Sequence, residues 1–93
     1  MPSFKVAHIR EQGQNMLLFP LDRSFGQKTR DQQRAIINEL EDRAHGAGLA
    51  GRAAVFWESN GRTYSLGPQQ WRNFLRSIGI HRVMASVNKS ISW

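Results

Sequence analysis

Residues 52–66, Arg-Ala-Ala-Val-Phe-Trp-Glu-Ser-Asn-Gly-Arg-Thr-Tyr-Ser-Leu, decide the fold. Two runs rich in β-branched and aromatic residues flank Asn60-Gly61. This pair is typical of a two-residue hairpin turn, because both central residues of a type I′ turn need a positive φ. The pattern therefore predicts two strands, over residues 52–57 and 62–66, that pair as an antiparallel hairpin.

A second hairpin is predicted upstream, over residues 4–10 and 16–19. The first of these runs roughly alternates and contains β-branched residues, and residues 11–14 provide a turn with a glycine. Pro20 cannot donate to a sheet ladder, so it should end the second strand or lie on an edge.

Two helices are predicted from capping residues and apolar spacing. Thr29 and Gln32 have the spacing of a capping box, and His45-Gly46 closes the first helix, with Gly46 free to take a left-handed conformation. Its apolar face comprises Ile36, Ile37, Leu40 and Ala44. The second helix opens at Pro68 and ends at Gly79, and its apolar face comprises Trp71, Phe74, Leu75 and Ile78.

Residues 80–93 fit either a third helix or a strand, and the helix is the preferred interpretation. Residues 1–93 are then one α+β domain in the order ββαββα with this short third helix. Because consecutive strands joined by short turns tend to pair, we expect an antiparallel sheet of about four strands with the helices on one face.

The basic residues are distributed unevenly. The net charge is +6, with thirteen basic and seven acidic side chains. No acidic residue follows Glu58, so the last third of the chain carries most of the excess. Such asymmetry indicates an anionic partner for that region.

The polar face of the second helix is the sharpest functional signal, because its Arg, Asn and Gln side chains can bind phosphates or base edges. Trp57 and Tyr64, which lie opposite each other if the hairpin turn has two residues, could add base stacking. Arg34 and Arg43 lie on a charge-balanced helix and are expected to contribute much less. The candidate DNA- or RNA-binding residues are Arg62, Gln69, Arg72, Asn73, Arg76, Arg82 and Lys89.

The same face has a second interpretation, because any surface helix needs polar residues. The alternative function is a protein-interaction module, either a homodimer or an adaptor that meets an acidic partner. An exposed apolar patch containing Trp57, Met84 or Trp93 would favour this alternative.

No motif predicts catalysis, a cofactor, a metal or a small-molecule substrate. The chain has no cysteine, and its three histidines lack a partner at ligand spacing. Residues 46–51 match G-x-G-x-x-G, but a helix precedes them and a strand follows, the reverse of a dinucleotide site. Glu39, Glu41 and Asp42 share their helix with arginines and are more simply a solvated face. We therefore expect a binding protein and no enzyme.

No apolar run approaches the ~20 residues that span a bilayer, and charged residues interrupt the N-terminal stretch. With the absence of cysteine, this favours a cytoplasmic protein.

Three segments resemble small uncharacterised bacterial proteins associated with mobile or conjugative elements. They are residues 6–14 (Val-Ala-His-Ile-Arg-Glu-Gln-Gly-Gln), residues 19–26 (Phe-Pro-Leu-Asp-Arg-Ser-Phe-Gly) and residues 47–51 (Ala-Gly-Leu-Ala-Gly). The resemblance implies a bacterial cytoplasmic setting and assigns no functional residue. The strand–turn–strand–helix layout is also similar to that of some integrase-arm DNA-binding domains.

Overall fold

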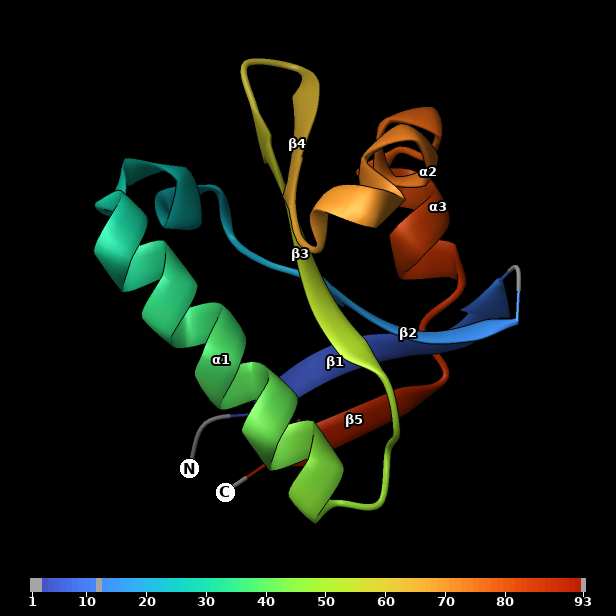
Figure 1. Ribbon diagram of the computed structural model, residues 1–93. Helices are drawn as coiled ribbons and strands as arrows, with labels where there is room; N and C mark the ends of the chain where they lie inside the picture. The colour runs from blue at the N-terminus through green and yellow to red at the C-terminus, as the bar shows by residue number, and fades with distance from the viewer. Residues whose placement is uncertain (1–2, 12, 93) are drawn as a thin grey trace.

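The computed structural model describes residues 3–11 and 13–92, which form a mixed sheet with helices against both of its faces (Figure 1). The strands are β1 (Ser3–Glu11), β2 (Gln14–Pro20), β3 (Arg52–Ser59), β4 (Arg62–Leu66) and β5 (Lys89–Ser92). The helices are α1 (Arg30–Gly46), α2 (Arg72–Ser77), α3 (Ile80–Ala85) and the 3-10 helices η1 (Arg23–Gln27) and η2 (Gln69–Trp71).

The α+β class predicted from the sequence is confirmed, but the sheet differs from the expected one. It has five strands in the order β4-β3-β2-β1-β5, and β2 pairs with β3 in parallel while the other neighbours are antiparallel. The prediction of about four antiparallel strands was therefore wrong in this detail. The reason is α1, because a helical crossover between neighbouring strands brings the second strand back in the same direction.

Helices cover both faces of the sheet, which corrects the prediction that they lie on one face. Leu17 and Phe19 of β2 pack in one cluster with Leu40 of α1, which we call the α1 core. Leu18 of β2 packs on the other face with Leu75 of α2, in what we call the α2–α3 core. Residues 16–19 and 53–56 are buried throughout, as unbroken apolar runs are when a strand is covered on both sides.

The β3–β4 hairpin has the predicted geometry. Trp57 lies opposite Tyr64 in the register, and Asn60 and Gly61 have φ values of 53° and 78°. Both central residues of the turn are thus left-handed, as a type I′ turn requires.

Replacing Gly61 tests this turn. Nothing lies within 4 Å of a Cβ built at Gly61, so a substitution there acts through the backbone alone. Gly61→Val should lower the free energy of unfolding by about 1–2 kcal/mol, because a β-branched residue resists positive φ. Gly61→Asn is the control and should lose less, since asparagine tolerates this region. Urea unfolding measures both, and equal values for the two variants would contradict the turn assignment.

Helix α1 begins as predicted and ends slightly later than predicted. The Thr29 hydroxyl accepts from Gln32 N at 3.2 Å, and the Gln32 side chain accepts from Thr29 N at 3.0 Å, which completes the capping box. At the other end Gly46 stays helical, and the left-handed residue is Gly48, with φ 86°. Gly48 N donates to His45 O and Leu49 N donates to Ala44 O, the two bonds of a Schellman motif. The left-handed assignment of Gly46 was therefore wrong by two residues.

The tail contains both structures that the sequence left open. Residues 80–85 form α3, and residues 89–92 form β5, which pairs with β1. Asn88 lies between α3 and β5 and fixes this connection to β1. Its side-chain oxygen accepts from His8 N at 2.9 Å, and its side-chain nitrogen donates to His8 O at 3.0 Å. In the described part of the chain, no helix is long and apolar enough to cross a bilayer.

Candidate nucleic-acid interface

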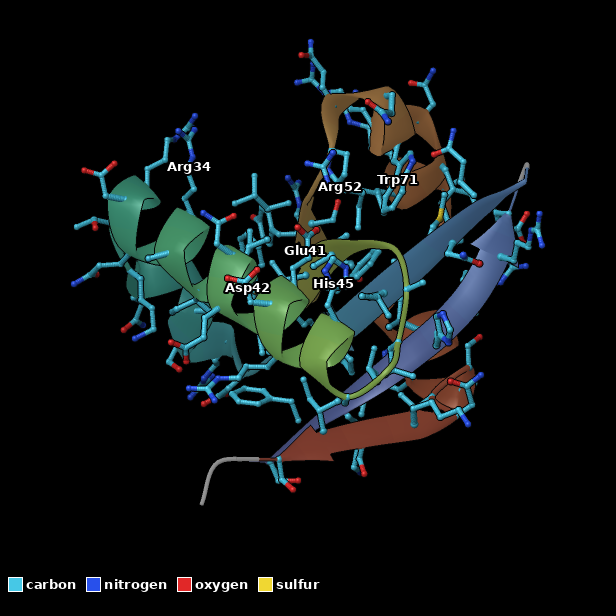
Figure 2. All side chains as sticks on the ribbon, turned by 60° about the horizontal axis from the view of Figure 1, so that its bottom comes forward. Arg34, Glu41, Asp42, His45, Arg52 and Trp71 are labelled. Carbon is cyan, nitrogen blue, oxygen red and sulfur yellow. The ribbon has the colours of Figure 1, made fainter. Side chains whose placement is uncertain are left out.

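Five arginines gather at one edge of the sheet, where β4 ends and the chain turns toward α2. Arg30 and Arg34 belong to the first turns of α1, Arg52 begins β3, and Arg72 and Arg76 belong to α2. They line two adjoining hollows that share Arg30 and the end of β4. We call this concave surface the arginine groove. Arg34 and Arg52 can be followed in Figure 2.

The floor of the groove depends on a glycine. Gly67 follows β4 directly, and a Cβ built there would lie 2.7 Å from the Cβ of Ala54 and 3.2 Å from a methyl group of Leu75. A larger residue would push the chain away from β3 and α2. Because residue 67 is glycine, Pro68 and η2 can pass close to the sheet and carry α2 toward the first turns of α1.

Buried side chains fix the orientation of α2. Trp71 and Leu75 are buried in the α2–α3 core, and the Trp71 indole Nε1 donates to the Gln14 side chain at 2.6 Å. The helix thus has one orientation against the sheet. Arg72 and Arg76 lie on its exposed side.

Among the described residues that line the groove, Glu41 carries the single carboxylate. One of its oxygens accepts from Ala53 N at 2.8 Å and lies 3.4 Å from Arg52 Nε (Figure 2). The β3–β4 ladder ends at the Val55–Leu66 pair, so the ladder does not reach Ala53. Glu41 is therefore a structural acceptor that ties α1 to β3, and it offsets part of the positive charge.

The structure gathers part of the set of residues that the sequence predicted. Gln69, Arg72 and Arg76 line the groove, and Asn73 is exposed on the same short helix. Arg62 is exposed at the start of β4, beyond the groove. Arg82 is exposed on α3, and Lys89 lies on β5, at the opposite edge of the sheet from β4.

Sequence reasoning missed three groove residues, Arg30, Arg34 and Arg52. The prediction that Arg34 contributes little rests on the balanced charge of α1, whereas the structure places Arg34 in the groove. The spacing of Arg30 and Arg34 was an available signal, since residues i and i+4 lie on one face of a helix.

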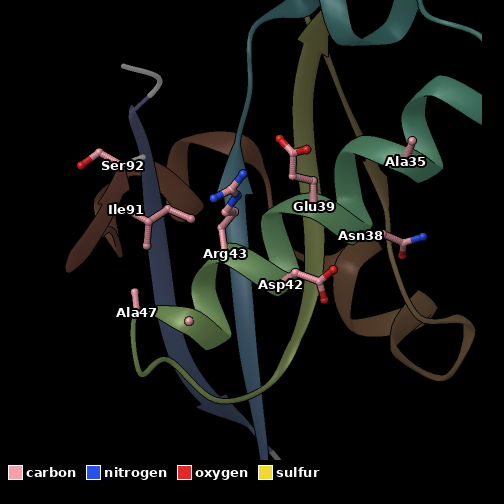
Figure 3. Close-up of a pocket in the computed structure, with 9 residues that line it drawn as sticks. Ala35, Asn38, Glu39, Asp42, Arg43, Ala47, Ile91 and Ser92 are labelled. Atoms are coloured by element: carbon pink, nitrogen blue, oxygen red, sulfur yellow. The ribbon is translucent and has the colours of Figure 1, made fainter.

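A larger hollow than those of the arginine groove lies on the other side of α1, and its lining residues carry a different mixture of charges. Its volume is about 1000 Å³, and Figure 3 shows Glu39, Asp42 and Arg43 of α1 on one side, with Ile91 and Ser92 of β5 nearby. Two carboxylates and one guanidinium do not favour a phosphate. We therefore place the candidate site at the smaller arginine groove, because its charge is predominantly of one sign.

The exposed apolar residues do not form the patch that would favour a protein partner. Among the described residues, the large exposed hydrophobic side chains are Tyr64 and Met84. Tyr64 lies on the sheet face that α1 covers, and Met84 belongs to α3 on the opposite face. Trp57 packs against Phe25, and Trp93 lies outside the described residues.

Two histidine side chains form hydrogen bonds with backbone carbonyl groups of the loop that carries the G-x-G-x-x-G pattern. The Nε2 atom of His8 lies 3.1 Å from Ala50 O, and that of His45 lies 2.6 Å from Gly51 O. The loop joins the end of α1 to β3, in the order that the sequence predicted. No group of three or more potential metal ligands occurs within residues 3–11 and 13–92.

Comparisons with known protein families, with curated proteins and with solved structures gave no match. Function therefore has to be inferred from the residues of the groove.

Proposed function

We propose that this protein binds nucleic acid without catalysis, through the arginine groove. The observation that carries the proposal is the convergence of five arginines from α1, β3 and α2, where Glu41 is the single carboxylate among the described lining residues. Nucleic acid is the preferred anionic partner because its phosphates recur at regular intervals and can engage several arginines at once.

The basic residues that line the groove are arginines, which favours contacts with phosphate groups. A guanidinium presents a planar fork of donors that matches phosphate geometry, and it stays charged at every physiological pH. A concave surface of one sign also focuses the electrostatic field and speeds the encounter with an oppositely charged ligand. Gln69 lies among these arginines and Asn73 lies nearby, so base-edge contacts belong to the same proposal.

The first experiment measures binding directly. Fluorescence anisotropy with labelled oligonucleotides should detect binding at about 50 mM salt and a steep loss of affinity at about 200 mM, because bound phosphates release counterions. Polyglutamate is the competitor that tests for a general attraction to polyanions. If no oligonucleotide binds at low salt, the proposal fails, and the adaptor for an acidic protein replaces it.

Glu41 provides a second test, in which binding should become tighter. Glu41→Gln keeps an acceptor for Ala53 N but removes the negative charge from the groove, so affinity should rise by about 2- to 5-fold. Glu39→Gln is the matched control, because Glu39 lies on the same helix but lines the large hollow shown in Figure 3. Equal gains in the two variants would show that net charge alone governs binding.

We also propose a cellular setting, which rests on the resemblance of three segments to bacterial proteins of mobile or conjugative elements. A nucleic-acid binder of this kind would act in the bacterial cytoplasm, and a role beside mobile or conjugative DNA would agree with the resemblance of its sequence.

A further inference from the structure

Three aromatic rings form a row that runs from η1 to the β3–β4 hairpin, on the sheet face that α1 covers. The ring centroids of Phe25 and Trp57 are 5.0 Å apart, and those of Trp57 and Tyr64 are 5.8 Å apart with planes only 16° from parallel. Phe25 is buried and Trp57 is half-buried, whereas Tyr64 is 42% exposed. The row therefore ends in a ring that is supported on one face and accessible to solvent.

Gly26 helps to hold the row in place. A Cβ built at Gly26 would lie 2.5 Å from the indole nitrogen of Trp57, so only a glycine lets η1 approach this closely. Trp57 is consequently held between η1 and Tyr64. The Tyr64 ring thus rests on a neighbour that is itself fixed.

Strand β4 carries this ring toward the groove. Alternate residues of a strand share a face, so Arg62, Tyr64 and Leu66 lie in line, each step about 7 Å long. Leu66 lines both hollows of the arginine groove. The exposed aromatic ring therefore lies between the groove on one side and the cationic Arg62 on the other.

We infer that the ligand of the groove is single-stranded nucleic acid, with one base stacked on Tyr64 and phosphates on either side contacting Arg62 and the groove arginines. This inference rests on the proposed function and specifies its ligand. Aromatic platforms beside basic grooves bind single strands, because every base has a π-face to stack. In a duplex both faces of each base are already covered, so a base would first have to be flipped out of the helix.

The position of helix α2 along the groove favours a single strand over a duplex. The two hollows have volumes of about 290 Å³ and 340 Å³, and their arginines come from α1, β3 and α2. Helix α2 has six residues and lies with Arg30 of α1 along one hollow. Helix α2 therefore does not project from the protein surface, as a helix that enters the major groove of duplex DNA must.

The test compares single-stranded DNA, single-stranded RNA and duplex DNA of one sequence by anisotropy. Wild-type protein should bind a single strand more tightly than the duplex. Tyr64→Leu should weaken single-strand binding by about 5- to 150-fold and leave duplex affinity unchanged, because it removes a stacking ring but no charge. Tyr64→Phe, which keeps the ring, should bind as the wild type does. The relative affinities for DNA and RNA identify which polymer is preferred.

A second measurement does not depend on a variant. Photocrosslinking of wild-type protein to an oligonucleotide that contains 5-iodouracil should label Tyr64. A preference for duplex, an equal loss for duplex and single strand in Tyr64→Leu, or crosslinks exclusively elsewhere would overturn the inference while nucleic-acid binding stands. Absence of binding to all three polymers would instead overturn the proposed function.

Discussion

Reversing the charges of Arg72 and Arg76 together, as Arg72→Glu and Arg76→Glu in one variant, is expected to abolish most nucleic-acid binding. Both side chains line the groove, and an arginine contact with nucleic acid contributes about 1–3 kcal/mol. Loss of both contacts should thus lower affinity by at least about 30-fold, and the repulsion of two new carboxylates adds to the loss. The slope of log affinity against log salt should fall by roughly one for each lost contact, which anisotropy at several salt concentrations measures.

The matched control reverses Lys5 and Lys89, which makes the same change in net charge. These two residues line one hollow beside β5, at the opposite edge of the sheet from the arginine groove. This control should retain most of the affinity and most of the salt slope. Both double variants should keep near wild-type unfolding curves, since charge changes on exposed side chains usually alter stability by no more than about 0.5 kcal/mol each. Equal losses in both variants would show diffuse attraction with no role for the groove.

The groove illustrates what sequence reasoning captured and what it missed. The exposed face of α2 was predicted because its residues are close in sequence and repeat at helical spacing. Three groove residues belong to segments in which basic and acidic residues balance: Arg30, Arg34 and Arg52. The net charge along the sequence therefore does not single them out. They meet Arg72 and Arg76 only because the crossover from β2 through α1 to β3 brings their segments to the end of β4.

In the fold, too, local features could be predicted from the sequence, whereas pairings between distant segments could not. Local signals such as the Asn60-Gly61 turn and the Thr29 capping box predicted the elements they belong to, since turns and caps depend on a few neighbouring residues. The parallel pairing of β2 with β3 depends on contacts far apart in sequence. Its signal was the unbroken apolar run in each strand, which indicates burial on both faces. The sequence prediction instead placed all the helices on one face of an antiparallel sheet, because it paired consecutive strands through short turns.

Replacing Phe56 with alanine is expected to remove a large share of the stability of the protein. Phe56 is 0% exposed and lies on the β3 face that forms the α2–α3 core with Leu75 and Val83. Phe56→Ala removes a fully buried ring and leaves a cavity, which should cost about 3–5 kcal/mol. The total free energy of unfolding of a small domain is about 5–15 kcal/mol, so the midpoint of urea unfolding should shift strongly.

Phe74→Ala is the control for this prediction, because Phe74 is only half-buried at the rim of the same core. It should cost clearly less, since solvent already reaches the ring and little cavity remains. The comparison also bears on function, because the α2–α3 core is what holds Arg72 and Arg76 beside Arg30. If both variants lost the same small free energy of unfolding, α2 and α3 would not pack on the sheet as described. The arginine groove would then lose the wall that α2 provides.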